Sequence, residues 1–381
     1  MLVIISDLHL TDGTSGSTIS PGAFQLLGER LAHLALNASQ RIDGRYQPVE
    51  HIDLVLLGDV LDVIRSTQWL ATPVRPWDDP TSPHLHDAVA RITSDVLRHN
   101  GATCSEFRRL ADRGVEIPAA LRNGRPAADR HCRVPVRIHY MVGNHDWFYH
   151  LPGGQYNTIR REIAAHMGLA TCPEAPFPHE GWEDNELLQT LRRHQVYARH
   201  GDVYDPFNFD GDRNSSSLGD VVVIELVSRF GVEVERQLGD ELPGCALAGL
   251  REIDNIRPLL LIPAWIEGLL DRSCPRPALR RQVKRVWDEL ADEFLAQPFV
   301  RQRDTWSPVD VVDGLQKALK FSRRLSVGWA SWVAKWLLRL RGADHAPGGG
   351  ESDDLDAAKL TAAKLGRIFS LGSPLAIGGG G

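Results

Sequence analysis

The amino-acid sequence predicts an α/β fold that continues into a large helical region. Short apolar runs that end in polar residues recur through residues 1–213, and stretches of helical periodicity separate them. From residue 214 to residue 341 the periodicity is helical, and beyond 341 the chain is rich in glycine. We therefore expect a core at 1–213, a helical insertion or cap at 214–341 and a Gly-rich tail at 342–381.

Four runs in the first half have a common design, in which a strand-like segment ends at a polar cluster. The runs are residues 2–6 before Asp7, 53–58 before Asp59, 136–143 before Asn144, and 195–199 before His200. In the third run Val136, Ile138 and Tyr140 alternate with Arg137 and His139, which is the period of a strand. Ligand sites in open α/β sheets lie beyond the carboxyl ends of the strands, so the four clusters should converge on one site.

The helical stretches show recognisable starts and apolar stripes. Residues 23–36 have helical spacing between the first two runs, and Ser216 or Ser217 can cap a helix that continues to about residue 237. A second stripe runs through 279–294, and Ser307-Pro308 is a typical helix start. One short helical candidate in the tail spans 357–369.

Composition limits the class of protein. The 381 residues carry a formal net charge of −6, and 43% of them are hydrophobic, which is typical of a globular protein and argues against a nucleic-acid partner. Five cysteines without C-x-x-C spacing favour free thiols and a cytoplasmic location. MLVIISDLHL lacks the basic start of a signal peptide. The longest later apolar stretch, at 258–270, is shorter than the roughly 20 residues of a membrane span, so no transmembrane helix is expected.

The polar clusters together have the composition of a two-metal site. Asp7 and His9 are two residues apart on a stretch expected to be extended, so their side chains should leave the same face and bind one ion. Asp59 is an anionic oxygen able to bridge two cations, while Asn144 and His200 supply an oxygen and a nitrogen. This mixture suits manganese, iron or zinc better than calcium. Two such ions activate water and stabilise charge in a displacement at phosphorus.

His145 is predicted to have a different role from the metal ligands. It follows Asn144 directly, and the neighbouring Asp146 offers it a carboxylate partner. An imidazole oriented in this way can protonate a leaving oxygen. We therefore expect His145 and Asp146 to form the catalytic pair.

Four spaced motifs resemble those of the calcineurin-like metallophosphoesterases. They are D-L-H at 7–9, G-D-V-L-D at 58–62, G-N-H-D at 143–146 and H-G-D at 200–202. The resemblance covers roughly residues 1–213 and implies a sandwich of two mixed β-sheets flanked by helices, with a dinuclear metal centre that hydrolyses a phosphoester. It also implies which residues form the site. Asp7, His9 and Asp59 would hold one ion, Asp59, Asn144 and His200 the other, His145 would be the catalytic imidazole, and Asp62 and Asp202 would be supporting carboxylates.

One motif of that family is missing. The family ends its core with G-H-x-H, whereas the sole histidine after His200 is His345, in a Gly-rich stretch without that pattern. Two explanations stay open. Either the chain stops before the last strands of the core, with 342–381 as a truncated remainder, or the site is divergent and has fewer ligands. The alternative function is accordingly a weak or inactive phosphoesterase-like binding or regulatory protein.

Two further segments allow two interpretations each. Residues 205–214 (DPFNFDGDRN), beside His200, are either a wall of the pocket for a phosphorylated small-molecule substrate or a set of Asp/Asn turns. Between Arg276 and Arg341 the chain has 14 Lys and Arg against 7 Asp and Glu. Trp329, Trp332 and Trp336 share one helical face there, which predicts either weak contact with a membrane surface or an apolar stripe packed on the core.

Overall fold

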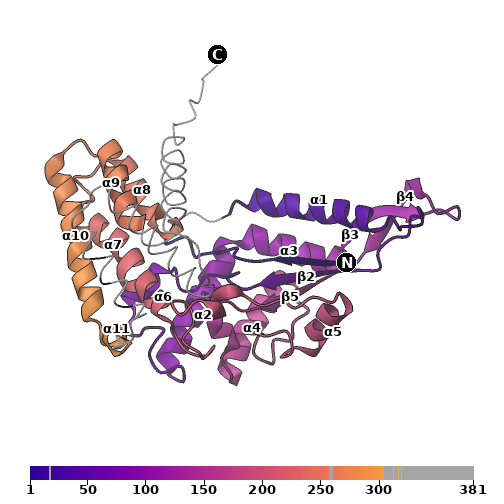
Figure 1. Cartoon of the computed structure of the whole chain (residues 1–381), viewed down its shortest axis with the longest axis horizontal. Coiled ribbons are helices and arrows are strands. Elements are labelled where there is room, and N and C mark those ends of the chain that lie inside the picture. Colours follow the sequence, from indigo (N-terminus) through magenta and orange to yellow (C-terminus); the bar gives the residue numbers. More distant parts are fainter. Residues whose placement is uncertain (17–18, 257–260, 304–311, 313–315, 317–318, 320–381) are drawn as a thin grey trace, which may run out of the picture.

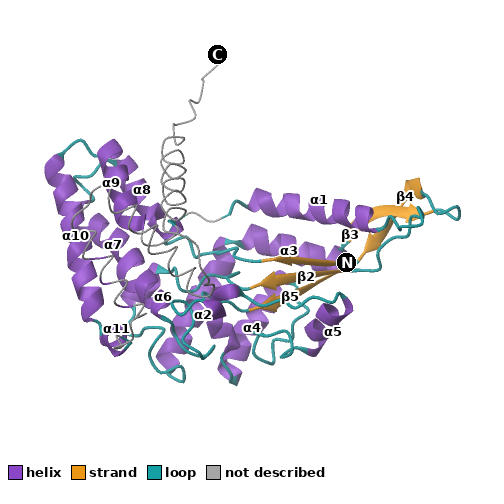
Figure 2. Ribbon diagram, in the orientation of Figure 1, coloured by secondary structure: helices purple, strands orange, loops and turns teal. Residues whose placement is uncertain are grey.

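A three-stranded parallel sheet lies at the centre of the N-terminal half of the molecule (Figures 1 and 2). The computed structural model describes residues 1–16, 19–256 and 261–303, together with 312, 316 and 319. The strands β1 (Leu2–Ile5), β2 (Ile52–Leu57) and β5 (Val136–Met141) lie in the order β1-β2-β5. Leu2 pairs with Asp53 and Ile52 with Val136, so all three strands end at the same edge of the sheet. The α/β class and three of the four predicted strands are confirmed.

The sheets differ from the expected sandwich in two respects. The second sheet is an antiparallel pair, β3 (Val115–Ala120) and β4 (Pro126–Val134), so among the described residues each sheet has a single strand direction and neither is mixed. The fourth predicted strand is also wrong. Within the described part of the chain, residues 195–199 pair with no strand and form a loop. Ala198 of this loop belongs to the small apolar cluster that contains Val55 and Met141.

Helices cover both faces of the parallel sheet. On β2 the side chains alternate, so Ile52, Leu54 and Leu56 enter the main core while Val55 faces a small second cluster with Leu187. The main core is completed by α1 (Pro21–Ala38), α2 (Pro83–His99), α3 (Gly101–Arg113) and α4 (Gly154–Met167), and the other face is covered by α5 (Asn185–Arg193). The helix predicted at 23–36 is confirmed as α1.

Short one-turn helices connect these elements at the site edge. They are η1 (Thr67–Ala71), η2 (Trp147–His150) and η3 (Gly201–Tyr204). Two of the three adjoin predicted motifs. Helix η2 begins directly after Asp146, and η3 begins inside the H-G-D motif, directly after His200.

Every described element after Asn214 is a helix. The elements are α6 (Leu218–Val221), the π-helical η4 (Val222–Ser228), α7 (Arg229–Leu238), α8 (Gly244–Arg251), η5 (Glu252–Asn255), α9 (Ile262–Ser273), α10 (Pro277–Ala296) and α11 (Pro298–Gln302). The predicted cap is present, since Ser217 and Asp220 form a capping box at the start of α6. The predicted stripe is the buried face of α10, including Val283, Trp287 and Phe294.

This helical unit has a core of its own beside the sheet (Figure 1). Phe230 is fully buried there, and its ring meets the Trp287 ring edge-on at 5.2 Å between centroids. The unit is tied to the sheet domain by an ion pair of 2.5 Å between Arg75 Nε and Glu225 Oε1. Glu225 lies on η4, and π-helical turns often occur at functional sites.

Several predictions fall on residues outside the described part. These are the helix at Ser307-Pro308, the face of Trp329, Trp332 and Trp336, the tail helix at 357–369, and His345. All five cysteines are free, as predicted. Among the described residues no helix combines the length and apolar character needed to cross a membrane.

Replacing Phe230 with Ala should destabilise the helical unit by about 3–5 kcal/mol, because it leaves a cavity beside Trp287. The matched control is Val232→Ala, on the same helix but 39% exposed, which should change stability by about 0.5 kcal/mol or less. Urea unfolding followed by far-ultraviolet circular dichroism measures both. Equal midpoints for the two variants would show that the core is not packed around Phe230.

Candidate metal centre

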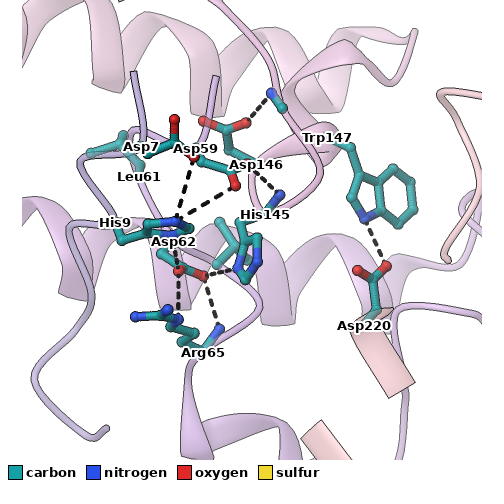
Figure 3. A network of polar contacts seen from close by, with 12 residues as sticks. Asp7, His9, Asp59, Leu61, Asp62, Arg65, His145, Asp146, Trp147 and Asp220 are labelled. Atoms are coloured by element: carbon teal, nitrogen blue, oxygen red, sulfur yellow. Dashed lines mark hydrogen bonds and ion pairs between the residues drawn. The ribbon is translucent and has the colours of Figure 1, made fainter. Parts of the chain in front are cut away.

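The polar clusters at the ends of β1, β2 and β5 meet as predicted (Figure 3). His9 is the central side chain. Its Nε2 lies 4.0 Å from Asp7 Oδ1 and 3.7 Å from Asp59 Oδ2. Ligand atoms of Asp7, His9 and Asp59 lie within 4.8 Å of one another, so these three residues can hold one metal ion. The expected first set of ligands is therefore together in space.

Tight turns of the backbone bring these three side chains together. The prediction that Asp7 and His9 lie on an extended stretch is wrong. Asp7 and His9 were expected on an extended stretch, but β1 ends at Ile5. Asp7, His9 and Asp59 all have left-handed backbones, with φ of 57°, 44° and 53°. Such conformations are costly for residues other than glycine and persist only where the surroundings enforce them. Here the two loops brace each other, since Asp7 N donates to Gly58 O (3.2 Å) and His9 N to Asp59 O (2.9 Å).

His200 reaches the same point from a connection that is not a strand. Its Nδ1 lies 3.0 Å from the Leu57 carbonyl oxygen, and its Nε2 lies 3.5 Å from Asp59 Oδ2. A histidine that donates one ring nitrogen to a carbonyl presents the other to a metal, a common arrangement of metal ligands. His9 has the same arrangement, with Asp62 as the acceptor for its Nδ1. Both imidazoles are thus oriented for Nε2 coordination around Asp59.

Two glycines make room for these close approaches. A Cβ on Gly58, whose φ is 78°, would lie 2.5 Å from the His200 ring, and one on Gly143 would lie 2.3 Å from Asp59 Oδ1. Neither position tolerates a side chain without displacing a candidate ligand. The glycines of the G-D and G-N motifs are therefore required by the contacts of the site.

Asp62 connects His9, a candidate metal ligand, to the predicted catalytic histidine (Figure 3). Its carboxylate is fully buried, with Oδ2 2.8 Å from His9 Nδ1 and Oδ1 2.9 Å from His145 Nδ1. The Arg65 backbone N–H also donates to Asp62 Oδ1 at 3.0 Å. His9, Asp62 and His145 also form a compact group of potential ligands, but their contacts have hydrogen-bond lengths, so they form an orienting relay.

The expected pairing of His145 with Asp146 is wrong. Asp146 accepts from Tyr140 Oη (2.6 Å), Gly143 N (2.6 Å) and Val60 N (2.9 Å), and its acceptor positions are used within the fold. Adjacent residues on this tight turn point their side chains in different directions, so His145 meets Asp62 from the neighbouring loop. Asp146 shapes the turn that carries His145.

Asn144 and Asp202 have distinct surroundings. Asn144 is buried between Gly143 and His145, whose backbone N–H donates to Asp59 Oδ1 at 2.8 Å. Asn144 is therefore next in the chain to a residue that contacts Asp59. Asp202 forms a buried ion pair with Arg213. Because Arg213 lies in the 205–214 segment, this pair anchors the segment two residues from His200.

The 205–214 segment contains the predicted Asp/Asn turns, and its role as a wall of a substrate pocket stays a prediction. Phe207 N donates to Asp205 Oδ1, and Asn214 N to Asp212 Oδ1, each at 2.9 Å, so the Asp/Asn turns are present. Arg213 also lies over the Phe209 ring, 4.9 Å from its centroid. Sequence reasoning missed Arg213, Arg65 and Tyr140, because no motif marks residues whose partners are distant in the chain.

Asp59 and the histidines around it shift each other's pKa. Burial opposes ionisation of Asp59, but the histidines around it outweigh burial and hold its pKa below the ordinary value. Burial likewise disfavours charge on His200, yet the Asp59 carboxylate raises the pKa of His200 to about 10. For Asp146, burial and the charge of Asp59 raise the pKa to about 6. Metal binding would release the proton from His200, because only the neutral imidazole coordinates a metal.

Comparison with known proteins gave no relative. No protein-family model, no curated protein and no solved structure matches this chain.

Gly143→Ala should weaken Mn²⁺ binding by at least about tenfold, because the added Cβ displaces the Asp59 carboxylate. The control is Gly154→Ala at the first position of α4, where an added Cβ meets nothing within 4 Å. Isothermal titration calorimetry gives both affinities. Equal affinities would show that Asp59 is not a ligand at the place the structure gives it.

Proposed function

We propose that this chain is a metal-dependent phosphoesterase that hydrolyses a phosphomonoester, phosphodiester or pyrophosphate. Asp7, His9 and Asp59 would hold one divalent ion, and Asp59, Asn144 and His200 a second, with manganese, iron and zinc as the ions that suit these donors. In this proposal the parallel sheet is the N-terminal part of a metallophosphoesterase-type sandwich. The four motifs and their convergence on one sheet edge support it.

The observation that carries the proposal is the bridging contact of Asp62. This one buried carboxylate orients two imidazoles. It lies 2.8 Å from Nδ1 of His9, the proposed metal ligand, and 2.9 Å from Nδ1 of His145, the proposed proton donor. With both Nδ1 atoms occupied, each imidazole can use only Nε2 for chemistry. The edge-to-face rings of His9 and His145 lie 4.8 Å apart between centroids, so the two functions are adjacent but separate.

The protein residues then have defined roles. The ions, when bound, supply Lewis-acid chemistry that polarises the phosphoryl group and activates water. His145 holds a proton on Nε2 and gives it to the leaving oxygen, while Asp62 stabilises the charged imidazole. Burial alone would lower the pKa of His145, but Asp62 and Asp59 raise it above the ordinary value, which suits a proton donor.

A second candidate is a binding or regulatory protein on the same scaffold. The observation in its favour is the 57% exposure of the Asp7 side chain, so the described residues leave one side of the first ion's position open to solvent. Metal affinity falls when fewer charged ligands hold the ion. This candidate predicts specific binding of a phosphorylated ligand without turnover.

His145→Ala should lower kcat for an aryl phosphate or bis-aryl phosphate by about 10²- to 10⁴-fold, because the leaving oxygen loses its proton donor. Asp59→Asn should abolish the dependence on added Mn²⁺ together with the activity. Steady-state kinetics with and without Mn²⁺ measures both, and His131→Ala, an exposed position on β4, is the control. Full activity in both variants would contradict the proposal, and absence of turnover in the unaltered chain would favour the second candidate.

Asp62→Asn should reduce kcat by about 10- to 100-fold, because both His9 and His145 lose their orienting carboxylate. Asp146→Asn should instead act mainly on stability, since its three hydrogen-bond donors, Tyr140 Oη, Gly143 N and Val60 N, hold the loops after β2 and β5 together. Comparing kcat with the thermal midpoint separates the two effects. A larger loss of kcat in Asp146→Asn than in Asp62→Asn would restore Asp146 as the partner of His145.

A further inference from the structure

The guanidinium of Arg65 lies against the buried carboxylate that orients both imidazoles of the candidate centre (Figure 3). Its Nε is 3.3 Å from Asp62 Oδ2, the oxygen that also meets His9, while the Arg65 backbone N–H donates to the other oxygen. The Arg65 side chain is 7% exposed and that of Asp62 is 0% exposed. The guanidinium is therefore a buried cation whose position acts directly on the Asp62 carboxylate.

The contact with Asp62 does not by itself fix the guanidinium. Arg65 Nε makes no directed hydrogen bond within the part of the chain that the structure describes, so its approach to Asp62 is ionic and has little angular preference. An arginine side chain has several rotatable bonds, and holding it in one geometry costs conformational entropy. The guanidinium therefore needs a second anchor to keep a single position.

The second anchor comes from the helical unit. Arg65 Nη1 donates to Asn255 Oδ1 at 3.3 Å, across 190 positions of the chain. Asn255 is the last residue of η5, and its Nδ2 donates to Glu252 Oε2 at 2.8 Å. Because the amide lies between a cation and an anion, its acceptor faces Arg65 and its donor faces Glu252. The Asn255 side chain is thereby held in the orientation that receives the guanidinium.

The loop after the first motif packs closely on this amide. A Cβ on Gly16 would lie 2.9 Å from Asn255 Nδ2 and 3.2 Å from the Arg251 carbonyl oxygen. The η5 turn therefore lies against the loop that follows His9, and the absence of a side chain at Gly16 permits the approach. The helical unit is thus in contact with the loop that carries the first candidate ligands.

We infer that Arg65 and Asn255 are positioning residues of the candidate centre. Through them the helical unit fixes the Asp62 carboxylate, which orients the two imidazoles of the centre. Asn255 holds the guanidinium, and the guanidinium holds one Asp62 oxygen. The consequence for turnover rests on the proposed phosphoesterase function, whereas the consequence for the two imidazoles does not.

The first test measures the imidazoles directly in the full, metal-free chain. Histidine labelled with ¹³C at Cε1 gives an NMR signal for each residue, and the variants His9→Gln and His145→Gln assign the two signals of interest. Asn255→Ala should shift both, while the signal of His131, exposed on β4, stays in place. Because Asn255 is itself exposed, the variant should keep its fold, which far-ultraviolet circular dichroism checks. Unmoved signals of both imidazoles would overturn the inference.

Asn157 provides the matched control, because it has the same kinds of partner on another element. Its Oδ1 accepts from Arg160 Nη2 and its Nδ2 donates to Glu174 Oε2 at 3.4 Å, on α4. Asn157→Ala should leave the two imidazole signals in place. Equal shifts in Asn157→Ala and Asn255→Ala would show a general loosening of the fold and would overturn the inference.

Substitutions of Arg65 test whether Asn255 acts through it. Arg65→Met removes the cation, whereas Arg65→Lys keeps one for Asp62, so the lysine variant should have signals closer to those of the unaltered chain. Asn255→Ala should cause no further shift when it is added to Arg65→Met, because the anchored group is already gone. Shifts that simply add would show that Asn255 acts by another route, against the inference.

Metal binding and activity form the second test. Asn255→Ala should weaken Mn²⁺ binding and lower kcat for an aryl phosphate, each by about three- to tenfold, with little change in KM. Asn157→Ala should change neither quantity. Absence of Mn²⁺ binding or of turnover in the unaltered chain would contradict the proposed function, and the imidazole signals would then decide the inference alone. In a chain that does turn over, an unchanged kcat and Mn²⁺ affinity in Asn255→Ala would overturn the inference.

Discussion

The candidate centre depends on the full burial of one carboxylate, Asp62. A carboxylate removed from water needs neighbouring groups that compensate its charge. For the two oxygens of Asp62 these neighbours are His9, His145 and the backbone N–H of Arg65. Burial therefore fixes the direction of two imidazoles that belong to loops far apart in the chain. The same constraint selects the ring nitrogen that each imidazole presents to the site, which is the property that metal binding and proton transfer both require.

Residues with strained backbone conformations and unusually close contacts lie around the Asp62 carboxylate. Three of the four non-glycine residues with positive φ in the described chain are Asp7, His9 and Asp59. Their conformation is held by backbone hydrogen bonds between the β1 and β2 loops and by the space that Gly58 and Gly143 leave open. Strain of this kind persists only where other contacts enforce it, which indicates that the fold is built to bring these side chains together.

Buried hydrogen bonds connect the start of the helical unit to the loop that follows β5. Trp147 Nε1, two residues after His145, donates to Asp220 Oδ2 at 3.2 Å (Figure 3). Asp220 also accepts from Ser216 and Ser217 at the start of α6. Burial raises the pKa of Asp220 above its ordinary value, with His145 among the groups that oppose the rise. The first turn of the helical unit is therefore packed against the loop that carries His145.

The sequence by itself determined the α/β class, the strands that end at Asp7, Asp59 and Asn144, and the helical nature of the chain after Asn214, because these follow from local periodicity and capping. It also indicated which polar residues meet, since the carboxyl ends of parallel strands share one edge. Only the tertiary structure decided that His145 pairs with Asp62 in place of Asp146, that residues 195–199 form no strand, and that His51, His139 and His194 surround Asp53. Those outcomes depend on contacts between distant segments and on the direction in which a tight turn points each side chain, and neither leaves a periodic signal in the sequence.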